Sequence, residues 1–181
     1  MTFRPRQVLW LIAGGATVWF GLLLLAPVLP PALGAIVYSI GALVCHQRPE
    51  RSFHWGGAQL AVCARCTGIY AGGCLALAAA AFQVPRGRYL TRLHLTRLHL
   101  ADLRGLRPLL VVAALPTAIT VGAEWAGWWF PSHAARAAAG LPIGVTAALL
   151  ISAALAPRQL LHYGECLPRA AAAPRPPQTP T

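Results

Sequence analysis

Long runs of apolar residues alternate with short polar segments along the chain. Three runs are long enough to cross a bilayer as helices, since a crossing needs about 20 residues. They extend from Gln7 to Leu29, from Ala58 or Cys63 to Phe82, and from Leu109 to Phe130, and a fourth run, Gly140 to Ala156, leads back across. The pattern predicts an all-α polytopic membrane bundle of about four transmembrane helices, in which the backbone polar groups are satisfied within each helix.

A shorter apolar run, Ala32 to Val44, follows the prolines that end the first helix. At the helical rise it reaches roughly 20 Å, which is too short for a hydrocarbon core of about 30 Å. We therefore expect a short half-helix on the outer side. The polar segment His46 to Gly57 is predicted to be a surface loop, with Glu50 and Arg51 making hydrogen bonds inside that loop.

The composition indicates a membrane protein, and this affects how the high positive net charge is interpreted. The 181-residue chain is 57% hydrophobic and only 10% charged, which excludes an ordinary soluble domain and makes the lipid bilayer its main partner. A net charge of +11 is compatible with nucleic-acid binding, but all 15 basic residues are arginines and most flank apolar runs. We expect no nucleic-acid partner, because the arginines are better explained by membrane topology.

The arginines are distributed unequally between the two sides of the predicted bundle. The outer side has Arg48, Arg51 and Arg136, Arg65 begins the second full span, and the inner side has the rest, namely Arg4, Arg6, Arg86, Arg88, Arg92, Arg97, Arg104, Arg107, Arg158, Arg169 and Arg175. This asymmetry predicts a multi-pass protein of the cell membrane with its N-terminus and arginine-rich loop in the cytoplasm. Residues 1–167 form one integral membrane domain, and residues 168–181, rich in Pro, Ala and Arg, are expected to be a disordered tail.

Candidate chemistry is concentrated between Cys45 and Tyr70. Cys45 and His46 close one apolar run, and Cys63 and Cys66 form a CxxC motif near the start of the next. Tetrahedral sets of Cys and His ligands of this size bind zinc and other thiophilic ions. The sequence therefore predicts an outward-facing metal site, first of all for zinc, at Cys45, His46, Cys63 and Cys66. Four ligands would make a structural site, whereas loss of one would leave an open catalytic position.

Other residues near this stretch are candidates for an accessory role. On a continuous helix, Gln59 and Tyr70 would share one face with Cys63 and Cys66, while Arg65 would point elsewhere. Gly68 and Gly72 form a GxxxG motif, which permits close helix contact and leaves a helix-mediated homo-oligomer open.

Glu124 is the only carboxylate inside a predicted span. A charge in that position is expensive unless it is paired, and Arg65, Arg136 and His46 are the candidate partners. We also consider Glu124, together with His133, as an occasional partner of the metal site.

Two alternatives use the same cysteines without a metal. In a quinone-linked thiol-disulfide oxidoreductase, the CxxC at a helix N-terminus would cycle, Arg65 would lower a thiol pKa, and Cys45 would be the resolving cysteine. In a structural alternative, one disulfide would join Cys45 to either CxxC cysteine in an oxidising compartment. The residues alone leave all three interpretations open.

The same stretch resembles a known family. CHQRPERSF, followed by QLAVCARCTGIYAG, is similar to the signature of a prokaryotic family of predicted membrane proteins, the domain of unknown function numbered twenty eighty-five. Further on, Pro116, Gly122, Arg136, Gly140 and Gly144 resemble its second block. Val121-Gly122 departs from the Asp-Gly pair that the family tends to show. The resemblance implies a membrane protein and strengthens the choice of site, and it implies no particular reaction.

Overall fold

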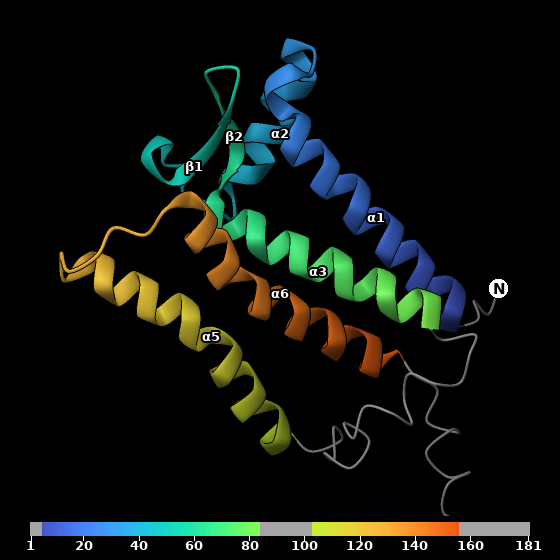
Figure 1. Cartoon of the computed structure of the whole chain (residues 1–181). Coiled ribbons are helices and arrows are strands. Elements are labelled where there is room, and N and C mark those ends of the chain that lie inside the picture. The colour runs from blue at the N-terminus through green and yellow to red at the C-terminus, as the bar shows by residue number, and fades with distance from the viewer. Residues whose placement is uncertain (1–4, 84–102, 156–181) are drawn as a thin grey trace, which may run out of the picture.

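The computed structural model describes residues 5–83 and 103–155 (Figure 1). Within these residues, four helices are long and apolar enough to cross a membrane. They are α1 (Pro5–Leu25), α3 (Ala64–Gln83), α5 (Leu103–Trp125) and α6 (His133–Ala154). The predicted all-α membrane bundle is confirmed, and a short two-stranded sheet is the only β structure in the described residues.

One end of the bundle carries all the shorter elements. A 3-10 turn, η1 (Ala26–Val28), extends α1 and leads into α2 (Pro31–Ala42), whose first residue is a proline with a backbone already suited to a helix start. With 12 residues, α2 is too short to cross, and it lies beside the sheet at this end (Figure 1). The expected half-helix is therefore confirmed.

The segment predicted as a loop forms a β-hairpin instead. After a 3-10 turn, η2 (Pro49–Arg51), strand β1 (Ser52–Trp55) pairs antiparallel with β2 (Ala58–Cys63). Gly56 and Gly57 have φ angles of 57° and 86°, the left-handed values that a tight hairpin turn requires. The prediction that Gln59 and Cys63 share a helix face is consequently wrong, because both belong to a strand.

Two central helices, α3 and α6, approach each other backbone to backbone. A Cβ atom on Gly68 would lie 1.9 Å from the Ala137 carbonyl oxygen, and one on Gly144 would lie 1.9 Å from the Ile69 carbonyl oxygen. Gly72 faces α6 in the same way. The GxxxG motif thus serves a contact within the chain, and a homo-oligomer stays a prediction without support from these glycines.

Helix α6 begins earlier than the sequence pattern indicated. We expected a span from Gly140 with Arg136 outside it, but the helix starts at His133. The Ser132 hydroxyl oxygen accepts a hydrogen bond from the Ala135 amide at 3.2 Å, as a helix N-cap does. This cap places Arg136 on the first turn of α6, where its side chain turns into the bundle.

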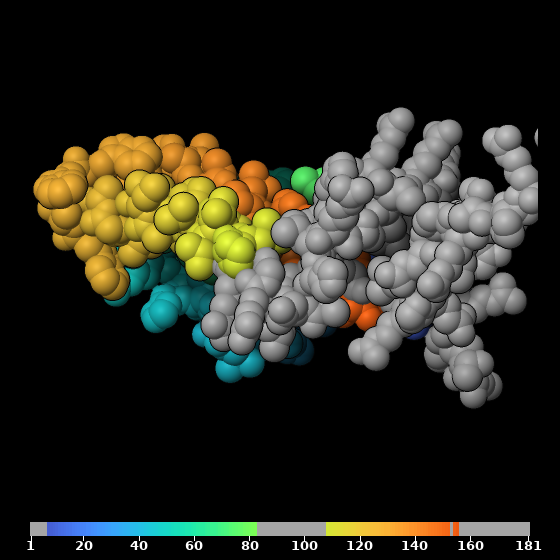
Figure 2. Space-filling view, turned by 90° about the horizontal axis from the view of Figure 1, so that it is seen from below, coloured from blue at the N-terminus to red at the C-terminus, as the bar shows by residue number. Residues whose placement is uncertain are grey.

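Helix α5 lies on the outside of the bundle (Figure 2). Its exposed side chains include Val111, Val112 and Ile119, which suits contact with lipid. The C-terminal end of α5 lies at the same end of the bundle as the hairpin (Figure 1). Exposed aromatic residues are concentrated there, namely Trp125, Trp128, Trp129 and Phe130. Such aromatic groups are typical of a membrane interface.

Several features lie outside the described residues: most of the arginine-rich loop, the tail at residues 168–181, and Cys166, which is expected on the cytoplasmic side. In the described part, α1 begins at the end of the bundle opposite the hairpin, and α3 ends there (Figure 1). This arrangement agrees with a chain that crosses the bilayer four times. The side of the membrane that each end faces stays a prediction.

Candidate metal centre

Three cysteines from three different elements meet at the hairpin end of the bundle. Cys45 follows α2, Cys63 ends β2, and Cys66 lies in the first turn of α3. Their sulfur atoms all lie within 4.8 Å of one another. Cys45 is buried and the other two are half-buried, above an apolar cluster that includes Leu23 and Val62. The four described cysteines are free thiols.

The loop after α2 is fixed to β2 by two glutamines and a glycine. The Gln47 side-chain amide donates to the Tyr38 carbonyl oxygen at 2.8 Å and to the Ala61 carbonyl oxygen at 2.7 Å. The Gln59 side-chain amide donates back to the Gln47 carbonyl oxygen at 3.2 Å. A Cβ on Gly41 would lie 2.7 Å from the Ala61 carbonyl oxygen, so only glycine permits this approach. These contacts determine where Cys45 lies.

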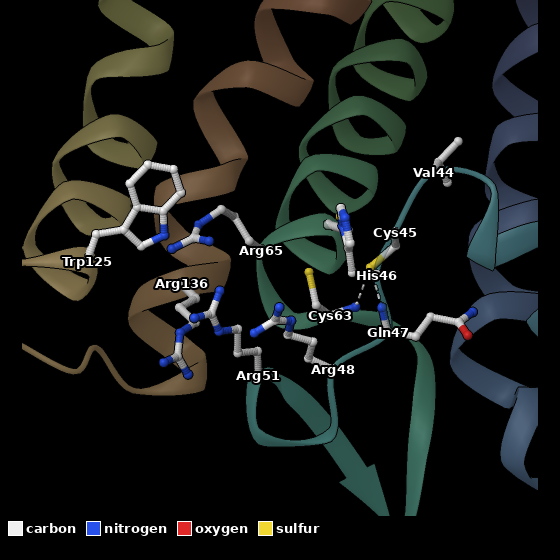
Figure 3. Close-up of a pocket in the computed structure, with 11 residues that line it drawn as sticks. Val44, Cys45, His46, Gln47, Arg48, Arg51, Cys63, Arg65, Trp125 and Arg136 are labelled. Atoms are coloured by element: carbon white, nitrogen blue, oxygen red, sulfur yellow. Dashed lines mark hydrogen bonds between the residues drawn. The ribbon is translucent and has the colours of Figure 1, made fainter.

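Hydrogen bonds stabilise the Cys45 sulfur as a thiolate. Its Sγ accepts the backbone amides of Cys63 at 3.1 Å and of Gln47 at 3.5 Å (Figure 3). Hydrogen bonds from the Cys63 thiol and then the Cys66 thiol, helped by these two amides, hold the pKa of Cys45 well below its usual range, although burial opposes them. A thiolate is the form of cysteine that binds metal.

The three sulfurs fit a tetrahedral metal ion. With metal–sulfur bonds of about 2.3 Å, zinc places its sulfur ligands roughly 3.8 Å apart. Because the three sulfurs are already within 4.8 Å of one another, small side-chain rotations bring them onto three corners of the tetrahedron. Among the described residues, no His, Asp or Glu atom joins this group.

His46, the fourth ligand expected from the sequence, is exposed. It lines the same cavity as the cysteines, but its ring nitrogens are not part of the sulfur group. His133 lies elsewhere: its Nε2 atom is 3.3 Å from the Glu50 carbonyl oxygen, and its ring packs on Phe53. The structure thus brings together three of the four predicted ligands and ties His133 to the hairpin loop.

A cavity of about 320 Å³ adjoins the cysteines. The sulfurs of Cys45 and Cys63 lie on one side of it, and guanidinium groups gather on the other, with Trp125 beyond them (Figure 3). These guanidinium groups belong to Arg48, Arg51, Arg65 and Arg136. The cysteine cluster therefore opens onto a strongly basic chamber.

Glu124, on α5, is the acceptor for three of these arginines. Its side chain is 5% exposed, and its Oε1 atom lies 2.9 Å from Arg136 and 3.2 Å from Arg51. Its Oε2 atom lies 3.5 Å from Arg65. The expected pairing with Arg65 and Arg136 is present, and no described ion pair joins Glu124 to His46. The expectation that Arg51 serves only its own loop is wrong, because it reaches across to α5.

Arg65 connects the cysteines to the arginine cluster. It stands between Cys63 and Cys66 in sequence and points away from them, as expected, so that its guanidinium also lies 3.4 Å from the Thr120 hydroxyl of α5. The Nε atoms of Arg65 and Arg136 are buried without a hydrogen-bond partner. The cluster therefore has donor capacity that Glu124 does not use.

The other candidate residues support the site indirectly. Gln59 holds the loop that carries Cys45, and its own Oε1 atom is buried without a partner. Tyr70 is half-buried and packs against the apolar cluster beneath the cysteines. Gln47, whose φ of 48° is left-handed, was not recognised as a positioning residue. The only signal for it was its place within the CHQRPERSF motif.

The residues of the site lie within the region of the chain that is similar to known proteins. Residues 45–150, from the first cysteine through Glu124 and Arg136, match the family described as "Predicted membrane protein (DUF2085)". The chain belongs to the DUF2085 family. Its match begins at Cys45 and contains every residue of the metal centre and of the arginine cluster.

Two archaeal relatives of this DUF2085 protein are themselves uncharacterised. One, from Methanocaldococcus jannaschii, is 56% identical over 36 residues, which are 20% of this chain and 23% of the relative. The other, from Methanothermobacter thermautotrophicus, is 34% identical over 107 residues, which are 59% of this chain and 83% of the relative. No solved structure matches the chain.

Proposed function

We propose that this DUF2085 protein binds one metal ion, zinc in the first place, through Cys45, Cys63 and Cys66. The observation that carries the proposal is the convergence of three sulfurs within 4.8 Å of one another. The two backbone amides that donate to the Cys45 sulfur, and so favour its thiolate form, support it. Three soft ligands in a tetrahedral arrangement suit zinc better than harder ions such as magnesium or calcium.

The fourth coordination position, on this proposal, faces the arginine-lined cavity. His46 contributes only weakly, because it is exposed and outside the sulfur group. A zinc site with three protein ligands keeps a position for water or a substrate atom, which is the arrangement of catalytic rather than structural sites. Zinc bound in this way acts as a Lewis acid and lowers the pKa of a coordinated water.

The same geometry favours a metal over the two thiol-only alternatives. A single disulfide would engage two of the three sulfurs and would leave the third without a function. A disulfide sulfur is also a weak hydrogen-bond acceptor, whereas the Cys45 sulfur receives two amides. A quinone-linked oxidoreductase needs a second reactive pair, and Cys74 lies about two helical turns beyond Cys66 on α3, too far along the helix to pair with it.

We further propose that the metal centre faces the outside of the cell membrane. The positive-inside rule places the end of the bundle that carries more arginines in the cytoplasm. The hairpin end has four arginines, Arg48, Arg51, Arg65 and Arg136, whereas the other eleven of the 15 arginines are expected at the opposite end. This asymmetry supports an outward-facing hairpin end.

Elemental analysis of the full-length protein, purified in mild detergent without chelators, tests the proposal. We expect about one zinc per chain in the wild type, and a loss of most of it in Cys63→Ser and in Cys66→Ser. Cys74→Ser is the matched control, since it removes a thiol of the same helix outside the sulfur group. Absence of stoichiometric metal, with Cys45 found in a disulfide by mass spectrometry, would overturn the proposal.

A further inference from the structure

The arginine cluster carries more positive charge than its one carboxylate can balance. Three guanidinium groups surround Glu124, so that the cluster has a surplus of two positive charges. The side chains of Arg51, Arg65 and Arg136 are only 30%, 14% and 8% exposed. Charges removed from water to this extent are costly unless a counter-charge lies close by. The cluster is therefore electrostatically incomplete as it stands.

Unused hydrogen-bond donors accompany this surplus charge. The Nε atoms of Arg65 and Arg136 are buried and have no partner, and both residues line the cavity. A buried donor without a partner costs free energy, and one belonging to a charged group costs more. These Nε atoms are inaccessible from the cavity, so a ligand in the chamber between the arginines and the cysteines would be bound by the other nitrogen atoms of the same guanidinium groups.

We infer that this cavity binds a phosphate group between the arginines and the cysteine cluster. A phosphate dianion supplies the two negative charges that Glu124 leaves unbalanced. Its oxygens accept from several arginines at once, which is a geometry that guanidinium forks favour. The cavity of about 320 Å³ also has room for a substituent on the phosphate, beside the apolar side chains of Val44 and Trp125.

The phosphate group has two sources, which share the oxygens that guanidinium groups bind but differ in charge, because a phosphate or a phosphate monoester carries two negative charges and a phosphodiester carries one. One is a soluble phosphate or phosphate ester, and the other is the phosphate of a lipid headgroup, which the exposed aromatic residues at this end place within reach of the membrane surface. The inference goes beyond the metal proposal and does not require it, because arginines of α3, α6 and the hairpin loop supply the contacts. If both hold, the phosphate would lie next to the open side of the metal.

Thermal unfolding of the full-length protein in detergent, titrated with inorganic phosphate, tests the inference. A ligand that binds only the folded state raises the unfolding temperature in proportion to its occupancy. We expect a saturable rise for the wild type. Because Arg51 is the most exposed of the three arginines that contact Glu124, Arg51→Gln should fold and weaken phosphate binding by at least about tenfold. His54→Gln, at an exposed position of β1 that does not line the cavity, is the control and should leave phosphate binding unchanged.

Vesicles separate the two sources. Competition of phosphatidylglycerol, but not phosphatidylcholine, with inorganic phosphate in reconstituted protein identifies a lipid headgroup phosphate, and no competition identifies a soluble one. The inference is overturned if neither phosphate nor the anionic lipid stabilises the wild type, or if Arg51→Gln binds phosphate as the wild type does. Cys63→Ser should lose metal yet still bind phosphate, so that failure of this inference is distinguishable from failure of the metal proposal.

Discussion

The backbone amide of Cys63 donates a hydrogen bond to the sulfur of Cys45 across 3.1 Å, and so joins the end of β2 to the loop after α2. This one contact places two thiols that are 18 residues apart in sequence in the same small volume. It also stabilises the negative charge on Cys45. The metal centre thus depends on the hairpin as much as on the CxxC motif.

The first prediction concerns the pH dependence of stability. The pKa of Cys45 is lowered by folding, so the folded state binds fewer protons at this site than the unfolded state does. The contribution of Cys45 to the free energy of unfolding is fully present above the usual thiol pKa of 9.0. It is lost as the pH falls from there towards the lowered pKa that Cys45 has in the folded state. In metal-free protein, the stability difference between the wild type and Cys45→Ala should therefore shrink between pH 8 and pH 5, as measured by denaturant unfolding. A difference that grows on acidification would contradict this assignment.

The second prediction concerns Glu124. Replacing it with Gln leaves three guanidinium groups without their shared carboxylate, and the loss of one partner of a buried ion pair costs about 3–5 kcal/mol. Glu124→Gln should lower the unfolding free energy by about that amount. Glu50→Gln removes a carboxylate whose side chain is 63% exposed, and it should cost less than about 1 kcal/mol. Equal effects of the two substitutions would show that the buried cluster has no special role.

The third prediction tests the contact between α3 and α6. In Gly68→Ala, the added methyl group would lie 1.9 Å from the Ala137 carbonyl oxygen, so the helices must separate and the protein should lose about 1–3 kcal/mol or more. Gly14→Ala in α1 is the matched control. Nothing lies within 4 Å of its added methyl, and better helix propensity should leave it neutral or slightly more stable. Thermal unfolding of both variants checks this prediction, and an unchanged Gly68→Ala protein would refute the contact.

The sequence predicted the parts of the fold that depend on local pattern. Four apolar runs became four membrane-length helices, and the run that was too short to cross became α2. The hairpin was missed because Leu60, Ala61 and Val62 are all buried, and a short run buried on every side has the same pattern in a strand as in a helix. The start of α6 was missed because alanines before Gly140 carry little hydrophobic signal.

The candidate site was predicted in outline, and its long-range contacts were not. The adjacent Cys and His and the CxxC motif identified three cysteines that meet in the structure. Nothing in local sequence shows that Arg51, 73 positions before Glu124, becomes its partner at 3.2 Å, because that pairing requires the hairpin loop to fold over α5. Glu124 was nevertheless recognisable as the only carboxylate inside a predicted span, which indicated that positively charged side chains must lie close to it.

The fourth prediction concerns the orientation in the membrane. His54 is exposed on β1, so a cysteine introduced there is accessible without disturbing the sulfur group. In intact cells, a membrane-impermeant maleimide should label His54→Cys and should leave Cys166 unlabelled until the membrane is opened. Labelling of Cys166 alone would reverse the proposed orientation.

The central claim is a metal held by three thiolates with a fourth position open to the arginine-lined cavity. Zinc-edge X-ray absorption on the purified, metal-loaded protein counts these ligands directly. We predict three sulfur neighbours at about 2.3 Å and one lighter atom at about 2.0 Å, and in His46→Ala the three sulfurs should remain with little loss of bound zinc. Fewer than three sulfurs, or a loss of zinc in His46→Ala as complete as in Cys63→Ser, would contradict the account.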